Sequence, residues 1–534
     1  MQAVHVTVAC ICLVFICVKT TEAKPCVTLK SEYRHDALDY GSDTSWFFRQ
    51  KMQYVHGNTL AGGAVTRKSR PQQYSMTGCA VFSPVVQSCL VTTGHFYTSF
   101  GAGLLIGRGN SFNPDPFSTR PMANPDRSFV PCLSGNPEYA FRGLGLSMCT
   151  PGDARMLDLN TFYSIQQRYT TDEYMNNGTT TQSINSLLSR TRKKDKYTQP
   201  VTIHTSGLSL SCHPGKYLLL QANYYTSKLV YDGSKTMEWN SEEDEFGSSS
   251  VRMLKGTGYY ACYRDDFVTA FVEHCFTYNR INRNGEPESP SASGIVTGTR
   301  YRGSFMEMHV MYKKTDPAFV APFGNALGSD NPEEVFSLRF EIEPVDSFQT
   351  GISIEDENSL SPSSYYDEYP HVRKRSMFFT LDQNAFSVNG DIARCDMFRS
   401  GENRYYTRQK LQYCLSPGER ISLDGKTMFQ QRRNSGYSWL TGCHLTYSRW
   451  MNFRVEGGLL WFSAQNGNPL YSTLLQLPGT SIPFMYITGR SLLGAFRMKF
   501  SRGPLTAWLR TLYPLYQQED DMKGVMEFAL SMEF

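Results

Sequence analysis

The chain has 534 residues, with 53 basic and 49 acidic side chains and a formal net charge of +4. This length predicts two to four domains, because single hydrophobic cores stop growing beyond about 250–300 residues. The near balance of charge gives no basis for nucleic acid as a partner.

Residues 1–23 have the composition of a secretory signal peptide. An apolar run from Val8 to Val18 is followed by polar residues and by the small Ala23. A membrane-spanning helix needs about 20 apolar residues, and neither this run nor any later segment provides them. The sequence therefore predicts a secreted, extracellular protein without a transmembrane segment, whose mature chain begins near Lys24.

Two distant stretches repeat the same motif. Arg49–Tyr54 reads Arg-Gln-Lys-Met-Gln-Tyr and precedes Thr77-Gly78-Cys79, and Arg408–Tyr413 reads Arg-Gln-Lys-Leu-Gln-Tyr and precedes Thr441-Gly442-Cys443. A shared head and a shared tail in the same order predict at least two duplicated modules.

Short apolar runs between turn-forming residues indicate strands. Phe305–Tyr312 and Phe336–Ile342 alternate apolar and polar residues, which is the period of a half-buried strand. Many such runs at regular spacing favour β-sandwiches. Only residues 154–167 and 504–516 have a locally helical composition.

Two polar regions predict exposed chain. Residues 169–198 hold a glycosylation sequon at Asn177 and the basic run 190–196, and we interpret them as a glycosylated loop. Residues 352–370 are acidic and rich in serine and tyrosine, which is typical of a linker. The basic run Arg373-Lys374-Arg375 follows as a solvated loop, and cleavage after Arg375 by a processing protease is an alternative role for it.

Eleven cysteines lie outside the signal peptide, and none forms a Cys-x-x-Cys pair, so disulfides in an oxidising compartment explain them better than metal ligation does. An odd number leaves one thiol unpaired or bonded to a partner, which admits a disulfide-linked or higher oligomer. The predicted disulfide cysteines are Cys26, Cys79, Cys89, Cys132, Cys149, Cys212, Cys262, Cys275, Cys395, Cys414 and Cys443.

One local pattern resembles a known family. Cys212 precedes the turn Pro214-Gly215, Cys414 precedes the turn Pro417-Gly418, and an alternating strand follows each turn. This arrangement is similar to that of the CUB domain, an extracellular jelly roll. A galactose-binding lectin-type module is the second resemblance, because Cys212 is followed by a strand with Ala-Asn-Tyr at residues 222–224.

The CUB resemblance implies an all-β chain of tandem jelly-roll β-sandwich modules. The implied modules are residues 24–145, a degenerate copy; residues 146–346, a copy with the glycosylated loop inserted; and residues 385–534, with an acidic Ser/Tyr linker at 347–384. The family pattern implies the pairs Cys262–Cys275 and Cys395–Cys414. The duplicated motif leaves open a rival connectivity, Cys26–Cys79 with Cys395–Cys443.

Calcium is the one cofactor that the resemblance suggests. Many CUB modules bind calcium through loop carboxylates, and Asp265 lies three positions after Cys262, where one ligand is found in the family. Otherwise no cofactor is predicted.

No histidine has the spacing of a catalytic or zinc motif, so we expect a protein that is not an enzyme. The predicted role is a secreted, multi-module binding or structural protein, adhesive or associated with extracellular matrix, whose partners are extracellular proteins or glycans. The alternatives are a secreted carbohydrate-binding lectin and a secreted ligand of a cell-surface receptor.

Overall fold

A computed structural model describes residues 26–35, 46–56, 59–68, 73–82, 88–107, 129–132, 140–150, 156–170, 188–189, 199–231, 251–278, 292–316, 319, 321, 333–359, 371–399, 402–418, 420–433, 436–450, 453–464, 470–472, 485–487, 489–502, 505–517 and 525–533. The regular structure in these ranges is strand, which confirms the predicted all-β class. Within them, no helix has the length and apolar character needed to cross a bilayer.

The strands follow one another along the whole chain. The first fourteen are β1 (Cys26–His35), β2 (Trp46–His56), β3 (Thr59–Lys68), β4 (Gln73–Phe82), β5 (Cys89–Thr98), β6 (Phe129–Pro131), β7 (Phe141–Cys149), β8 (Leu157–Thr170), β9 (Leu188–Ser189), β10 (Gln199–Cys212), β11 (Leu218–Tyr231), β12 (Val251–Arg264), β13 (Val268–Tyr278) and β14 (Ala292–Arg302). The others are β15 (Met306–Thr315), β16 (Glu333–Val345), β17 (Phe348–Ser359), β18 (His371–Gln383), β19 (Phe386–Arg399), β20 (Glu402–Gly418), β21 (Ile421–Arg432), β22 (Gly436–Trp450), β23 (Phe453–Ala464), β24 (Leu470–Ser472), β25 (Met485–Ile487), β26 (Gly489–Arg502), β27 (Leu505–Gln517) and β28 (Val525–Glu533).

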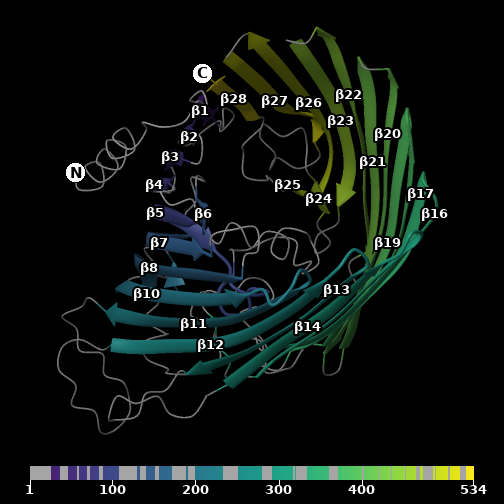
Figure 1. The fold of residues 1–534 in the computed structure, drawn as a ribbon. Coiled ribbons are helices and arrows are strands. Elements are labelled where there is room, and N and C mark those ends of the chain that lie inside the picture. The colour runs from purple at the N-terminus through teal and green to yellow at the C-terminus, as the bar shows by residue number, and fades with distance from the viewer. Residues whose placement is uncertain are drawn as a thin grey trace.

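The large sheet closes on itself through its first and last strands. β1 pairs antiparallel with β28, with Thr28 opposite Glu533. The remaining strands pair in chain order, except that β5 pairs β7, β8 pairs β10 and β23 pairs β26. Figure 1 looks into the resulting ring, with the two-stranded ribbon β24–β25 inside it. The architecture is a closed antiparallel β-barrel.

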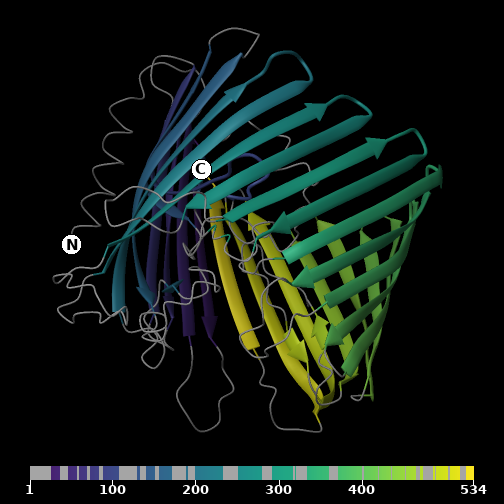
Figure 2. The ribbon, with the colours of Figure 1, turned by 90° about the horizontal axis from the view of Figure 1, so that it is seen from below.

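The barrel is wide. Of the 26 strands that the described residues contribute to the sheet, β6 and β9 are short additions to β5 and β8, so 24 of these strands form the closed circuit. An even number follows from the antiparallel closure, because every strand must run opposite to both neighbours. With a strand spacing of about 4.8 Å and a tilt of about 40°, the mean diameter is on the order of 50 Å. Figure 2 shows the inclined strands from another side.

Local turn chemistry explains the short hairpins. The turn with Pro214-Gly215 joins β10 to β11, and Pro417-Gly418 ends β20, where the register to β21 shifts between Leu415 and Gly418. Proline presets φ for the turn, whereas neither Gly215 nor Gly418 has the positive φ for which glycine is favoured. The sequence prediction of a turn followed by an alternating strand is confirmed at both places.

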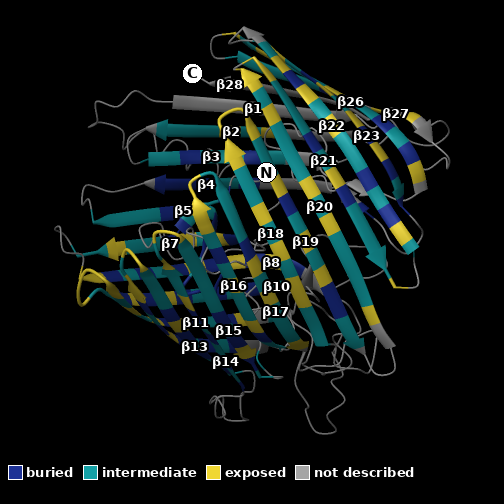
Figure 3. Ribbon diagram, turned by 90° about the vertical axis from the view of Figure 1, so that its right-hand side faces the viewer, coloured by how far each residue is buried: buried dark blue, intermediate teal, exposed yellow. Residues whose placement is uncertain are grey.

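Buried side chains gather on the inner side of the barrel. The larger cluster joins strands from β4 to β15, and the smaller one includes Leu440, Leu460, Phe462 and Leu470. Leu470 belongs to β24, which lies inside the ring, so the buried side of β22 and β23 faces inward. Figure 3 shows the other side of the wall, where exposed residues alternate with less exposed ones along each strand.

The prediction of tandem CUB-like jelly-roll sandwiches is wrong. A jelly roll packs two sheets face to face, whereas these strands belong to one sheet whose end strands pair with each other. The galactose-binding lectin-type module is wrong for the same reason. The pattern of cysteine, turn and strand that carried the resemblance belongs to ordinary hairpins of the barrel wall.

The sheet runs through the positions at which module boundaries were predicted. β7 spans the boundary between residues 145 and 146, and β17 pairs with both β16 and β18. The predicted linker, residues 347–384, therefore contributes two strands to the wall. Arg373–Arg375 lie in β18, so their interpretation as a solvated loop is wrong. Residues 1–23 and Asn177 lie outside the described residues.

The repeated motif occupies equivalent strands but different registers. Arg49–Tyr54 lie in β2 and Thr77–Cys79 in β4, while the second copy lies in β20 and β22. In the first copy, Gln53 lies opposite Gly62 of β3, which in turn lies opposite Cys79. In the second copy, the matching Gln412 lies opposite Lys426 of β21, which lies opposite Gly442. A one-residue shift moves a side chain to the opposite face. Cys79 is accordingly buried and Cys443 exposed.

The predicted disulfide framework is wrong for the cysteines that the structure describes. Within the described ranges, no disulfide joins the following cysteines: Cys79, Cys89, Cys132, Cys149, Cys212, Cys262, Cys275, Cys395, Cys414 and Cys443. Cys395 lies opposite Tyr406, eight positions along β20 from Cys414. At about 3.3 Å per residue this is about 26 Å, whereas a disulfide needs Cα atoms within about 7 Å.

Two of the other three pairings conflict with the register as well. Cys262 lies opposite Phe271, four positions from Cys275, or about 13 Å along β13. Cys395 is buried on the inner side of β19, while Cys443 is exposed on β22, with two strands between them.

A peptide map made without reduction is expected to contain neither a Cys395–Cys414 nor a Cys262–Cys275 linkage. Free thiols are first blocked in the folded and then in the denatured protein, and the digest is read by mass spectrometry. A Cys395–Cys414 peptide in the digest would contradict the pairing of β19 with β20.

Candidate functional site: the two faces of the barrel wall

Each strand separates an inner from an outer set of side chains. Register partners in an antiparallel sheet lie on the same face, and successive residues lie on opposite faces. On β10, every second residue from Val201 to Ser211 is buried. Leu208 and Leu210, which alternate with these buried positions, are exposed. The wall is therefore apolar on its outer face here, the reverse of a water-soluble sheet.

The outer face keeps this apolar character around the barrel. Leu459 and Trp461 of β23 are 51% and 46% exposed, although Leu460 and Phe462 beside them are buried. Other large exposed apolar side chains with the same outward orientation are Tyr163, Ile165, Leu220, Tyr259, Val272, Phe336, Ile352, Ile354, Met377, Phe379, Ile392 and Phe496. Exposed apolar side chains on so many strands indicate a contact surface for an apolar medium or partner.

The inner face of strands β8 to β15 is covered by a segment of the chain. Residues 99–107, which we call the inner segment, follow β5 and are almost entirely buried. Phe100, Leu104, Leu105 and Ile106 belong to the larger buried cluster. Phe100 packs on Phe162 of β8 with ring centroids 6.0 Å apart. The inner segment thus lines the wall from within.

A buried carboxylate anchors the inner segment. Glu273 of β13 is fully buried, and its Oε2 accepts a hydrogen bond of 3.2 Å from the Leu104 amide. The amides of Ala102 and Gly103 also donate to this carboxylate. Gln221 of β11 adds a hydrogen bond of 2.8 Å from the Gly101 amide to its Oε1. Four successive amides of the segment are therefore satisfied by the wall.

Glycines in the wall make room for the inner segment. A Cβ at Gly258 would lie 3.0 Å from Leu105 and 2.9 Å from the Cys275 sulfur, and a Cβ at Gly256 would lie 2.3 Å from the Tyr225 ring. Gly101 and Gly103 in the segment itself have φ values of 60° and 92°, a region that favours glycine.

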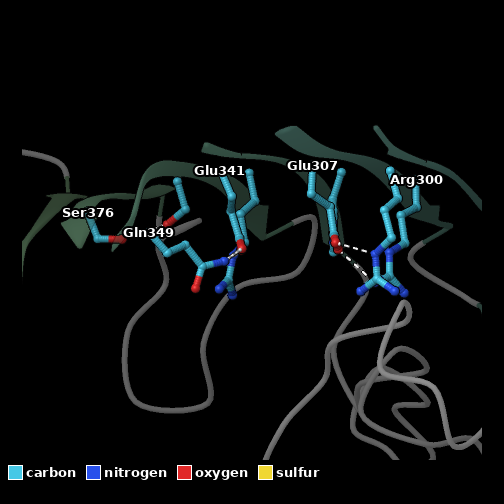
Figure 4. Close-up of polar contacts among 9 residues, drawn as sticks. Arg300, Glu307, Glu341, Gln349 and Ser376 are labelled. Carbon is cyan, nitrogen blue, oxygen red and sulfur yellow. Dashed lines mark hydrogen bonds and ion pairs between the residues drawn. The ribbon is translucent and has the colours of Figure 1, made fainter. Parts of the chain in front are cut away.

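The inner face of β14 to β18 is polar instead. Near the tight-turn end, Arg300 pairs with Glu307 at 2.8 Å, and the Gln349 amide donates to Glu341 at 2.6 Å. Figure 4 shows both contacts on neighbouring strands, with Ser376 further along the wall. These residues share one face because Glu307 lies opposite Glu341 in the register.

Ion pairs continue along this face toward the other end of the barrel. Lys313 contacts Glu333, and Lys374 contacts Glu355 and lies 3.4 Å from Glu357. On the far side, Arg497 pairs with Glu456 across β23 and β26. The interior therefore combines an apolar sector with a charged sector, a surface suited to polar solutes.

The predicted calcium ligand lies at a tight turn, away from this charged sector. Asp265 lies between β12 and β13, and its Oδ1 accepts hydrogen bonds from the amides of Val268 (2.6 Å) and Phe267 (2.8 Å). Its Oδ2 accepts one from the Tyr263 hydroxyl at 2.8 Å. In the described ranges, no group of three or more His, Cys, Asp and Glu side chains has metal-binding geometry. Calcium at Asp265 stays a prediction.

The three hydrogen bonds, the Val268 amide first, hold the pKa of the Asp265 carboxyl below its usual range. A depressed folded pKa stabilises the turn at pH above the unfolded value of about 3.9, and this stabilisation is lost as pH falls through the folded value. We expect the Val268 amide to exchange its hydrogen faster below that pH, and Asp265→Asn to remove the pH dependence. Asp266→Asn is the matched control; an equal effect there would contradict the assignment.

Sequence reasoning missed Glu273 and the ion pairs. One signal was present, since Arg339 and Glu341 occupy the polar positions of the alternating run Phe336–Ile342. Charges at successive inward positions of a strand are typical of a polar interior, but the same pattern describes a solvated face.

Several solved structures resemble the fold. The ferric enterobactin receptor PfeA from Pseudomonas aeruginosa has 7% identity and a TM-score of 0.48, covering 97% of this chain and 81% of its own. The siderophore receptor PirA from Acinetobacter baumannii has 7% identity and a TM-score of 0.47, with the same coverage. The FrpB iron transporter from Neisseria meningitidis has 9% identity, a TM-score of 0.45 and coverage of 97% and 82%. No family model and no curated protein sequence matches the chain.

At this level of similarity the structures assign no ligand to this chain. By name, these proteins are receptors and a transporter.

The predicted role as a secreted adhesive or matrix-associated protein is wrong, and so are the two alternatives, a secreted lectin and a secreted receptor ligand. A secreted module buries its apolar faces between packed sheets, whereas this single wall turns Leu459, Trp461 and their equivalents outward. The extracellular localisation, which was predicted from residues 1–23, and the protein or glycan partners, which were inferred from that role, are corrected with it.

Proposed function

We propose that the protein spans a membrane as a closed β-barrel and provides a controlled passage for polar solutes. The observation that carries the proposal is the alternation along the strands: most of the large exposed side chains on the outer face are apolar, while inward side chains are charged or polar or belong to the two buried clusters. Membrane barrels show this order, because lipid surrounds the outer face and no backbone group is left unpaired in a closed sheet.

Strand length and aromatic placement support membrane insertion. The strands of the circuit have 9 to 17 residues, and about 9–11 tilted residues cross the hydrocarbon core. Exposed aromatic side chains gather near the tight-turn end, where membrane barrels carry an aromatic girdle at the interface. They are Tyr217, Tyr263, Phe267, Phe305, Phe386, Tyr447 and Phe500.

The two ends of the barrel differ in their connections. At one end short stretches join the strands, such as residues 265–267, 303–305 and 384–385. At the other end many connections are long, such as residues 171–187 and 232–250, although residues 400–401 and 433–435 form short connections there. Short turns on one side and long loops on the other are typical of bacterial outer-membrane barrels.

The inner segment makes the passage a controlled one. It covers the apolar inner sector, and the charged sector of β14 to β18 adjoins this sector in the sheet. Water and polar solutes favour the charged sector, so movement of residues 99–107 would change the space available to them. Large membrane barrels likewise have an interior that is filled by a plug.

Reconstitution tests the proposal. The protein refolded into lipid vesicles is expected to resist added protease, to migrate differently on electrophoresis before and after boiling, and to admit small polar dyes. A variant lacking the seven residues 100–106 should admit larger dyes at higher rates, while keeping the same migration. A protein that stays in the aqueous phase, or vesicles that remain impermeable with and without residues 100–106, would contradict the proposal.

A further inference from the structure

An arginine-rich cavity lies on the outer wall, near the long-loop end of β18 to β21. Its volume is about 430 Å³, and its lining includes Arg375, Arg394, Arg404, Arg433, Asp396 and Tyr405. Two of these arginines, Arg375 and Arg394, contact the one carboxylate of this lining, that of Asp396.

The register places two of these arginines side by side. Arg375 of β18 lies directly opposite Arg394 of β19, and both side chains are exposed. Like charges directly opposite each other in a sheet are destabilising. Asp396 offsets only part of this repulsion, at 2.9 Å from the Arg394 Nε and 4.0 Å from the Arg375 guanidinium. The arrangement is suited to an added anion between the two guanidinium groups.

The chemistry of the lining favours phosphate. Guanidinium groups bind phosphate oxygens through paired N–H donors, more specifically than an ammonium group does. The Arg394 guanidinium also lies over the Tyr405 ring, 5.1 Å from its centroid, which fixes the direction of that side chain. The cavity therefore presents its donors in a restrained geometry.

The position of the cavity favours a lipid as the source of that phosphate. Met377 and Ile392 lie two residues from Arg375 and Arg394 toward the middle of the wall, and they are 64% and 54% exposed. Two strand residues span about 7 Å. The arginines thus lie directly beyond the apolar surface, at the level where headgroups border the hydrocarbon core.

We propose that this cavity binds the phosphate of an anionic membrane lipid whose acyl chains lie against Met377 and Ile392. The inference rests on the proposed membrane insertion. It goes beyond the passage through the barrel, because it assigns a lipid site to the outer wall at the long-loop end.

The test compares lipid retention by two charge-matched variants. Arg375→Gln with Arg394→Gln removes the facing pair, and Lys228→Gln with Lys314→Gln removes two outward charges near the same end of other strands. Each protein is refolded into vesicles of equal parts phosphatidylcholine and phosphatidylglycerol, extracted in mild detergent and analysed by native mass spectrometry. We expect the wild type and the lysine variant to retain similar amounts of phosphatidylglycerol. The arginine variant is expected to retain about tenfold less.

Three results would overturn the lipid assignment. One is equal phosphatidylglycerol retention by the arginine variant, and another is equal retention of phosphatidylcholine by the wild type. The third is displacement of the bound lipid by millimolar inorganic phosphate, which would indicate a site for free phosphate. Vesicle flotation and electrophoretic migration before and after boiling are measured on the same samples. A protein that inserts but shows no lipid preference contradicts this inference alone. A protein that never inserts contradicts the proposed function.

Discussion

Leu459→Arg is expected to lower the free energy of unfolding in a bilayer by about 2–4 kcal/mol, the cost of an arginine facing lipid near the midplane. Leu459 lies in the middle of β23 and is 51% exposed on the outer face. The guanidinium group would be placed in hydrocarbon, where it loses its water. The measurement is a reversible urea titration of the protein in short-chain lipid vesicles.

Tyr437→Arg is the matched control for this variant. Tyr437 is 54% exposed and lies one residue from the start of β22, near the long-loop end. Close to the interface the cost of arginine falls to about 0–1 kcal/mol. Equal costs at the two positions, or no cost at Leu459, would show that this face does not lie against lipid.

Glu273→Ala is expected to release the inner segment from the wall. The substitution removes the acceptor for the amides of residues 102–104, and each buried amide left without a partner costs about 1–3 kcal/mol. We expect hydrogen exchange across residues 99–107 to accelerate by at least about a hundredfold, which corresponds to about 2.7 kcal/mol. Exchange measured by mass spectrometry on the folded barrel provides the readout.

Glu273→Gln separates the loss of the anchor from the loss of charge. Glutamine retains one acceptor oxygen at nearly the same position, so the segment should remain partly protected. Ser227→Ala, at another buried inward position, controls for general loosening of the wall. Unchanged exchange at residues 99–107 in Glu273→Ala would contradict the anchoring role of this carboxylate.

The sequence predicted strands better than it predicted their environment. Phe305–Tyr312 and Phe336–Ile342 lie in β15 and β16, as their alternation indicated. Alternation reports that a strand has two unlike faces, and it does not report which face meets water. In Phe336–Ile342 the apolar positions face outward, so the pattern that predicted a sandwich core describes a barrel wall instead.

Both segments with helical composition are strands. Residues 154–167 overlap β8, whose buried positions Asp158, Asn160 and Phe162 alternate with outward residues. Residues 504–516 overlap β27, in which Pro514 lies at a register irregularity opposite Leu493. Proline donates no hydrogen bond and is tolerated in a sheet at such irregularities. Tertiary pairing therefore decided these elements against local composition.

The contact between the inner segment and Glu273 could not be predicted from the sequence, for a different reason. Glu273 lies 169 positions from Leu104, and no local spacing connects them. The glycines at residues 256 and 258 carried a signal of close approach, because glycine inside a strand often marks a neighbouring backbone or ligand. What approaches them became evident only when the strands were placed in one closed sheet.

The pairing of β1 with β28 has a consequence for how the chain must be produced. Until the last strand is in place, both end strands expose unpaired amides and carbonyls, which are templates for aggregation. Bringing Thr28 to Glu533 costs about 3–4 kcal/mol more in chain entropy than closing a short hairpin. This cost is modest, but contacts between residues so far apart in the sequence form slowly, and the end strands stay exposed during that time. A truncation that removes β28 should therefore convert a stable barrel into an aggregating chain, although nearly every other strand pair remains available.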